Sequence, residues 1–277
     1  MATVRKSKSP AGTNDPAVRQ KKKKLIRGIV LLCILLIVMI GCVLGLYWLK
    51  NRMFEDNKRF TLRHVNIVSS GYWGKDSITA RQLLNKLDLH IGKSNLFALQ
   101  PEKLRRELRS IPNVEDARVR AVLPDTLEIK IEERTPRAFI GRPRSPLVVD
   151  ANGVVMNAGE CFGVHDNLPV INGGVHTTMS SGEVHTALRP ALHLIMTVQR
   201  YKNFSVAAVS LRQPDNLVTL MDYRRGSMVR RYHVTMPRGN YTEWLDILQS
   251  AIEDAIRRGD GRNRINLTFK NQVVMSH

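Results

Sequence analysis

Histidine and acidic side chains are the residues of this chain that could bind a metal or transfer a proton. His176, His185 and His193 are nine and eight residues apart, and this spacing lacks the close pairs typical of metal ligands. Glu132 and Glu133 are adjacent, and adjacent residues of a strand point to opposite faces, so their carboxylates do not face one substrate. We therefore predict no metal site and no pair of catalytic acids.

Nucleophiles and cofactor-binding loops are also poorly represented. Cys33 and Cys42 lie in an apolar run and Cys161 stands alone, so no disulfide framework is indicated. The sequence lacks a Gly-x-Ser-x-Gly elbow, a phosphate-binding glycine loop and a dinucleotide fingerprint. These observations predict a protein that is not an enzyme and binds no cofactor.

Basic residues are in large excess. The 277 residues carry a formal net charge of +19, and this length allows one or two domains with cores of their own. Residues 1–27 hold nine Lys and Arg against one Asp and little apolar surface, so we expect a disordered cytoplasmic tail. Because aromatic residues are not interleaved with the basic ones, we expect no nucleic-acid binding. The Lys21–Lys24 cluster is instead placed to contact anionic membrane lipids.

An uncharged apolar segment follows the tail. Gly28–Leu49 contains 22 residues, with Leu36 near its centre. A helix of this length is about 33 Å long, enough to span the roughly 30 Å hydrocarbon core of a bilayer. Tyr47 and Trp48, at its far end, match the aromatic belt of a membrane interface. We predict a single-pass anchor with the N-terminus in the cytoplasm and the bulk of the chain outside it.

Two other kinds of N-terminal segment share some of these features. A cleaved signal peptide has an apolar core of only about 7–15 residues, which is shorter than this run. A lipoprotein would be modified at Cys42, since Met39–Cys42 resembles a lipobox, but the apolar run continues for seven residues beyond that cysteine. An uncleaved membrane helix therefore remains the preferred interpretation.

The stretch from Asn95 to Pro136 predicts a helix followed by two paired strands. The helix is opened by Pro101 and stopped by Pro112, and its apolar face consists of Leu104, Leu108 and Ile111. Both strands alternate apolar with charged residues, and their apolar positions are Ala117, Val119, Ala121, Leu127, Ile129 and Ile131. A strand at His64–Val68 and a helix with an apolar stripe precede them, so the order is strand, helix, helix, strand, strand.

This order, together with four short motifs, resembles a POTRA domain, and more narrowly that of the FtsQ and DivIB family of bacterial cell division proteins. The motifs are Gly92…Asn95-Leu96-Phe97, Ile111-Pro112-Asn113-Val114, Leu123-Pro124-Asp125-Thr126-Leu127 and Glu132-Glu133-Arg134-Thr135-Pro136-Arg137-Ala138. The resemblance places a POTRA domain over residues 60–134. The implied fold class is α+β behind a single transmembrane helix.

Residues 135–277 are expected to form a second, mixed α/β domain with an antiparallel type of sheet. A helix is predicted after Asn240, where Glu243 would complete a capping box. A final half-buried strand is predicted where Ile265, Leu267 and Phe269 alternate with polar residues.

The resemblance implies a non-catalytic scaffold of the division machinery, located in the cytoplasmic (inner) membrane at the septum. It further implies that the POTRA domain recruits other divisome proteins. The last strand would bind small bitopic partners of the FtsB and FtsL type. On this sequence the partner-binding strand maps to Ile265, Asn266, Leu267, Thr268, Phe269, Lys270 and Asn271.

An exposed edge strand has unpaired backbone groups to which an incoming segment can add as a new strand. We expect Asn266–Lys270 to supply these groups, with Leu267 and Phe269 filling the core; alternatively, the strand only completes the sheet and partners bind elsewhere. Two other function classes remain open. A POTRA-bearing transport component would repeat the domain or continue into a barrel, and a membrane-anchored cell-wall enzyme would need a nucleophile or metal cluster in residues 138–277.

Overall fold

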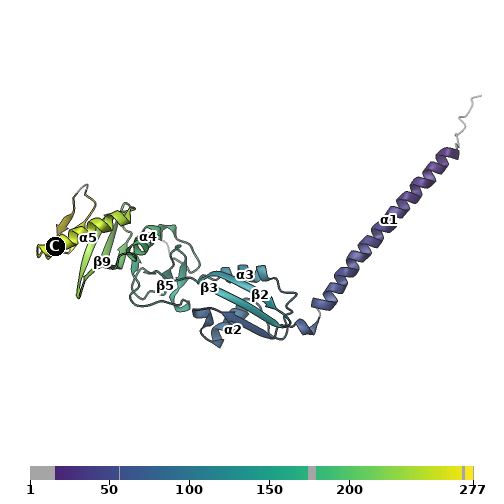
Figure 1. Ribbon diagram of the computed structural model, residues 1–277, viewed down its shortest axis with the longest axis horizontal. Helices are drawn as coiled ribbons and strands as arrows, with labels where there is room; N and C mark the ends of the chain where they lie inside the picture. Colours follow the sequence, from purple (N-terminus) through teal and green to yellow (C-terminus); the bar gives the residue numbers. More distant parts are fainter. Residues whose placement is uncertain (1–15, 56, 174–178, 270–271, 277) are drawn as a thin grey trace, which may run out of the picture. The chain divides into compact units, whose positions relative to one another are not determined.

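The computed structural model describes residues 16–55, 57–173, 179–269 and 272–276, and it divides into residues 1–60 and 61–277. The first unit is dominated by helix α1 (Pro16–Lys50), shown at the purple end of the chain in Figure 1. The helix includes part of the tail that we expected to be disordered, because the good helix formers Ala17, Gln20 and Lys21–Lys24 extend it. Residues 1–15 of that tail lie outside the described residues.

One helical segment among the described residues is long and apolar enough to cross a membrane. It spans Ile29–Phe54 and none of its hydrophobic window is buried. The segment runs through the end of α1 into a short π-helix, η1 (Asn51–Glu55), and a 3-10 turn, η2 (Lys58–Phe60), follows. The predicted single apolar helix near the N-terminus is therefore present.

The second unit begins with a three-stranded sheet in the order β1-β3-β2. Its strands are β1 (His64–Val68), β2 (Val114–Val122) and β3 (Thr126–Glu133), and its helices are η3 (Tyr72–Gly74), α2 (Ser77–Lys86) and α3 (Pro101–Arg109). β3 pairs in parallel with β1 and antiparallel with β2. The predicted order of strand, helix, helix, strand, strand is confirmed.

One core cluster joins both helices to one face of this sheet. Leu127, Ile129 and Ile131 of β3 are each at most 4% exposed, as their alternation with charged residues predicts. They pack with Leu83 of α2 and Leu108 of α3, which are fully buried. The remaining face of the sheet carries the charged residues.

A second, mixed sheet follows in the order β12-β11-β10-β9-β8-β7-β4-β5-β6. Its strands are β4 (Ala138–Ile140), β5 (Leu147–Val149), β6 (Val155–Asn157), β7 (Val170–Asn172), β8 (Phe204–Ser210), β9 (Asn216–Arg225), β10 (Met228–Pro237), β11 (Arg264–Asn266) and β12 (Val274–Ser276). Three of its strand pairs are parallel, namely β4 with β7, β7 with β8 and β10 with β11. The other pairs are antiparallel, so the fold class is α+β as predicted.

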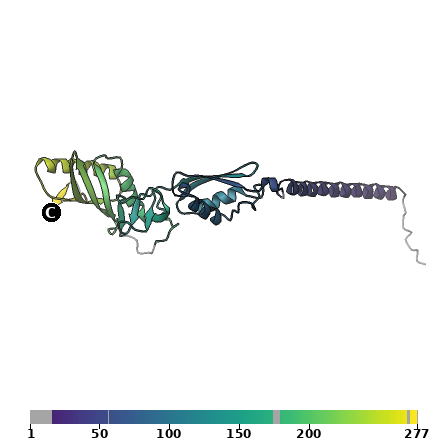
Figure 2. The same cartoon turned by 90° about the horizontal axis from the view of Figure 1, so that it is seen from below.

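Two helices cover one face of this sheet, α4 (Arg189–Val198) and α5 (Tyr241–Arg257), and two 3-10 turns precede them, η4 (Ala158–Glu160) and η5 (Thr186–Leu188). Figures 1 and 2 show α5 lying along the sheet that contains β9. Leu245, Leu248 and Ile252 of α5 are fully buried against the strands. The predicted cap of α5 is wrong, because Asn240 adopts a left-handed conformation with φ of 49° and makes no side-chain cap hydrogen bond.

Candidate functional site

The C-terminal end of the second sheet is the candidate site. β12 is its outermost strand and pairs antiparallel with β11, with Ile265 opposite Met275. No strand among the described residues pairs with the outer edge of β12. The sheet therefore ends in a strand whose outer backbone groups face no neighbouring strand.

The opposite end of the sheet is different. The amide of Val155 in β6 donates to the carbonyl of Glu183 at 2.9 Å, and the amide of Gly182 donates to the carbonyl of Val155 at 2.8 Å. The chain at 182–184 thus covers the β6 edge with backbone hydrogen bonds. At the other end, β12 has no such cover from a strand among the described residues.

The structure corrects the predicted terminal strand. β11 ends at Asn266, so Thr268 and Phe269 lie in the loop that leads to β12, and Lys270 and Asn271 lie outside the described residues. Ile265 and Leu267 are buried as predicted, each 1% exposed, but the side chain of Phe269 is 51% exposed and does not fill the core. The edge belongs to β12, which the sequence did not predict.

Asn266 ends the strand. Its side-chain oxygen accepts hydrogen bonds from the amide and the hydroxyl of Thr268, at 2.9 and 2.8 Å. This local turn competes with continued ladder pairing, which is why the alternating pattern does not extend into a longer strand. The amide of Leu267 still donates to the carbonyl of Thr235 in β10, at 2.8 Å.

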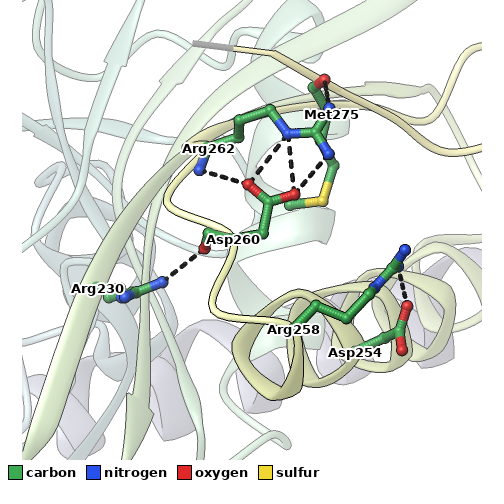
Figure 3. A network of polar contacts seen from close by, with 6 residues as sticks. All are labelled: Arg230, Asp254, Arg258, Asp260, Arg262 and Met275. Carbon is green, nitrogen blue, oxygen red and sulfur yellow. Dashed lines mark hydrogen bonds and ion pairs between the residues drawn. The ribbon is translucent and has the colours of Figure 1, made fainter.

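An arginine and an aspartate hold β12 in place (Figure 3). Nη1 of Arg262 donates to the carbonyl of Met275 in β12 at 2.9 Å. The carboxylate of Asp260 fixes this guanidinium, with Nε and Nη2 of Arg262 at 2.9 and 2.5 Å from Oδ2. The residue that precedes β11 by two positions therefore contacts the backbone of the last strand.

The ion pair between Arg262 and Asp260 changes the pKa of the aspartate. The hydrogen bonds from Arg262 lower the pKa of Asp260 from 3.8 to about 2. The backbone carbonyl of Asp260 also accepts a hydrogen bond from Nη1 of Arg230 in β10, at 3.0 Å. Arg258, the residue after α5, pairs with Asp254 of that helix (Figure 3), and its charge contributes to the lowered pKa of Asp260.

A hollow of about 340 Å³ lies beside β12. Four strands line it, and its lining includes Val218 of β9, His233 and Thr235 of β10, Asn266 of β11 and Val274 of β12. An incoming strand could place side chains in this hollow while its backbone pairs with the sheet edge. Sequence reasoning missed it because its residues come from strands far apart in the chain.

The predicted membrane anchor residues all lie in α1. Gly28 and Leu36 fall within the helix, and Tyr47 and Trp48 are 63% and 60% exposed near its end. The guanidinium of Arg52 lies 5.2 Å from the ring centre of Trp48. An aromatic side chain next to a cation is the composition expected where a membrane helix leaves the hydrocarbon.

The described residues contain no group of three or more His, Cys, Asp and Glu side chains that could hold a metal. His185 lies 2.9 Å from Glu183, and His193 packs edge-on against Tyr241, so these two histidines lie in different surroundings. His176 lies outside the described residues. Burial raises the pKa of the Cys161 thiol to about 12, which keeps it protonated and unreactive.

The two adjacent glutamates have separate surroundings, and Glu133 has a structural role. The carboxylate of Glu133 accepts hydrogen bonds from the amides of Tyr72 and Trp73, at 2.8 and 2.9 Å, and from the hydroxyl of Ser69. Glu132 lies on the charged face of β3.

Comparisons with known proteins agree with this architecture. Residues 60–134 match the family described as POTRA domain, FtsQ-type. The chain is 20% identical to cell division protein FtsQ of Koribacter versatilis, over 87% of this chain and 69% of that protein. It is 24% identical to cell division protein FtsQ of Zymomonas mobilis, over 86% and 79%. It is also 24% identical to cell division protein DivIB of Clostridium acetobutylicum, over 78% and 83%. The similarity therefore extends well beyond the POTRA domain.

Proposed function

We infer that this chain, a member of the FtsQ/DivIB family of cell division proteins, is a non-catalytic membrane-anchored scaffold. It captures a partner by strand addition on the free edge of β12. In this proposal the single apolar helix anchors the chain in the cytoplasmic membrane, and the POTRA domain and the second domain lie outside the cytoplasm at the division septum. The observation that carries this proposal is that no strand among the described residues pairs with the outer edge of β12.

The chemistry of this edge favours a peptide partner. Backbone groups of an outermost strand pair with any extended segment, while the hollow beside β12 selects side chains. The proposed partner is a small bitopic division protein of the FtsB or FtsL type, as the resemblance to the family implies. The POTRA domain then serves recruitment of other divisome proteins.

The decisive variant removes a backbone donor from β12. Met275→Pro deletes one amide and fixes φ, whereas Met275→Ala shortens the same side chain and keeps the amide. We expect Met275→Pro to abolish capture of the purified extracytoplasmic domain of the FtsB-type protein from the same organism. Met275→Ala should retain most of the binding, and both proteins should keep the thermal unfolding midpoint of the wild type. Equal binding by both variants would overturn strand addition at β12.

The cellular role needs a separate test. The protein fused to a fluorescent tag that is stable outside the cytoplasm should form a band at midcell, and its depletion should produce filamentous or enlarged cells. A uniform membrane signal with normal division would contradict the scaffold and favour a transport component.

A further inference from the structure

A cleft of about 710 Å³ opens in the second domain, away from β12. It lies between the turn after β5, the start of α4 and the turn from β10 to α5, and it shares no lining residue with β11 or β12. Its lining includes Arg189, Leu192, His193, Met196, Arg238 and Tyr241. None of its lining residues is acidic, so the cleft is basic and its two arginines have no carboxylate partner among the lining residues.

The floor of this cleft is apolar. Leu192 and Tyr241 are 1% and 3% exposed, and Met196 is half-buried beside them. The ring of His193 packs edge-on against Tyr241, with 5.1 Å between the ring centres. Apolar lining with a few polar groups is typical of binding clefts of this volume.

Two guanidinium groups provide the charge. Arg189, in the first turn of α4, is exposed, and its guanidinium forms no hydrogen bond or ion pair with any described residue. Arg238 is held by the carbonyls of Gln213 and Leu211, at 2.7 and 3.4 Å from Nη2. Its Nε is buried and has no acceptor in the described part of the chain, and no carboxylate pairs with its charge. One arginine is therefore fixed in place and the other is free to close over a ligand.

We propose that this cleft binds a peptide segment of a protein partner that presents a carboxylate beside an apolar side chain. The carboxylate pairs with Arg189 and Arg238, whose planar donor groups match carboxylate geometry. The neighbouring apolar side chain packs on Leu192, Met196 and Tyr241. This second docking site is independent of the β12 edge and does not depend on the proposed strand addition.

The apolar floor and the two arginines together determine which ligand fits the cleft. An isolated phosphate would use the arginines but leave the apolar floor exposed to water. A purely apolar segment would bury Arg189 beside it without a partner, which costs free energy. An acidic and apolar peptide satisfies both.

The test uses the full-length protein in nanodiscs and a phage library of random dodecapeptides. Peptides selected on the wild type should be enriched in Asp or Glu next to an apolar residue. They should bind Arg189→Glu about tenfold more weakly or worse, because charge reversal replaces attraction with repulsion. Arg200→Glu, at an exposed arginine after the end of α4 and outside the cleft, is the matched control and should bind like the wild type.

Four results would overturn the proposal. One is a selection without acidic enrichment, and another is equal binding of the selected peptides to Arg189→Glu and wild-type protein. Displacement by inorganic phosphate as readily as by unlabelled peptide would show a general anion site instead. Peptides that lose binding in Met275→Pro but not in Arg189→Glu would occupy the β12 edge, which would support the proposed function while refuting the cleft.

Discussion

The carboxylate of Asp150 holds the guanidinium of Arg134, with Nη1 of Arg134 at 2.9 Å from Oδ2 of Asp150. The two side chains are only 5% and 17% exposed. The other oxygen of Asp150 accepts hydrogen bonds from the amides of Asn152 and Val154, at 2.9 and 2.8 Å. Because Arg134 follows β3 and Asp150 follows β5, this pair ties the end of the POTRA sheet to the first turn of the second sheet.

Replacing Asp150 by Ala should destabilise the protein strongly. The change leaves Arg134 charged and largely buried without its partner, and it removes the acceptor of two amides. Loss of one partner of a buried pair costs roughly 3–5 kcal/mol. Urea denaturation of the full-length protein in detergent micelles measures this loss as a lower midpoint.

An exposed pair serves as the control for Asp150. Arg144 and Asp166 lie 2.6 Å apart, but their side chains are 75% and 67% exposed. Water and salt screen such a pair, so Arg144→Ala should leave the urea midpoint unchanged. Equal midpoints for wild type, Asp150→Ala and Arg144→Ala would contradict the structural role of Asp150.

The core at the end of β11 gives a second prediction. Leu267 is 1% exposed and Phe269, two residues later, is 51% exposed. Leu267→Ala should cost about 2–5 kcal/mol of unfolding free energy, since it opens a cavity in the core, whereas Phe269→Ala should change it by about 0.5 kcal/mol or less. Chemical denaturation distinguishes these outcomes. If Phe269→Ala lost as much unfolding free energy as Leu267→Ala, Phe269 would be buried. The longer strand that its alternation with Leu267 predicts would then be supported.

Asn113 supports a third prediction. Its side-chain oxygen accepts a hydrogen bond from Nε1 of Trp73 at 3.1 Å, and its amide donates to the carbonyl of Glu160. Both Asn113 and Trp73 are at most 2% exposed. Asn113→Ala should therefore cost roughly 1–3 kcal/mol, because the indole N–H stays buried without an acceptor. In Trp73→Phe protein that donor is absent, so the added effect of Asn113→Ala should be smaller. Equal effects in both backgrounds would show that this hydrogen bond contributes nothing.

Short-range signals made the POTRA domain predictable. Leu104 and Leu108 are one helical turn apart behind Pro101, and all of β3 alternates between a buried and a charged face. These patterns lie within single elements, so the sequence alone determines which side of each element is buried. The same applies to the apolar helix that spans Ile29–Phe54.

The candidate site depends on contacts that no local pattern contains. β12 has only three residues, Val274–Ser276, and its place in the sheet follows from pairing with β11. The two-residue spacing of Asp260 and Arg262 is a signal for their ion pair, but the bond from Arg262 to Met275 requires the position of β12. At Asn266 the sequence predicts pairing that does not form. The alternating pattern predicts a longer strand, but the local turn at Asn266 ends it.

Acid should loosen β12 through Asp260. Its pKa is lowered from 3.8 to about 2 in the folded protein by hydrogen bonds from Arg262. A lowered folded-state pKa means that the carboxylate stabilises the fold above its ordinary pKa, and that this stabilisation is lost as pH falls through the folded value. The window in which the clamp on β12 weakens is therefore between pH 3.8 and about 2.

Hydrogen exchange of β12 amides, normalised to the intrinsic rate at each pH, measures this loosening in the full-length protein. The normalised exchange of Val274 and Ser276, which lie opposite Asn266 and Arg264 of β11, should accelerate in the wild type as pH falls through that window. In Asp260→Asn it should already be fast at neutral pH and change little, because Arg262 has lost the charge that fixes it. Asp254→Asn removes a carboxylate that pairs with Arg258 and does not contact β12, so it should follow the wild type. An Asp260→Asn profile that matches the wild type would show that β12 is held by its pairing with β11 alone.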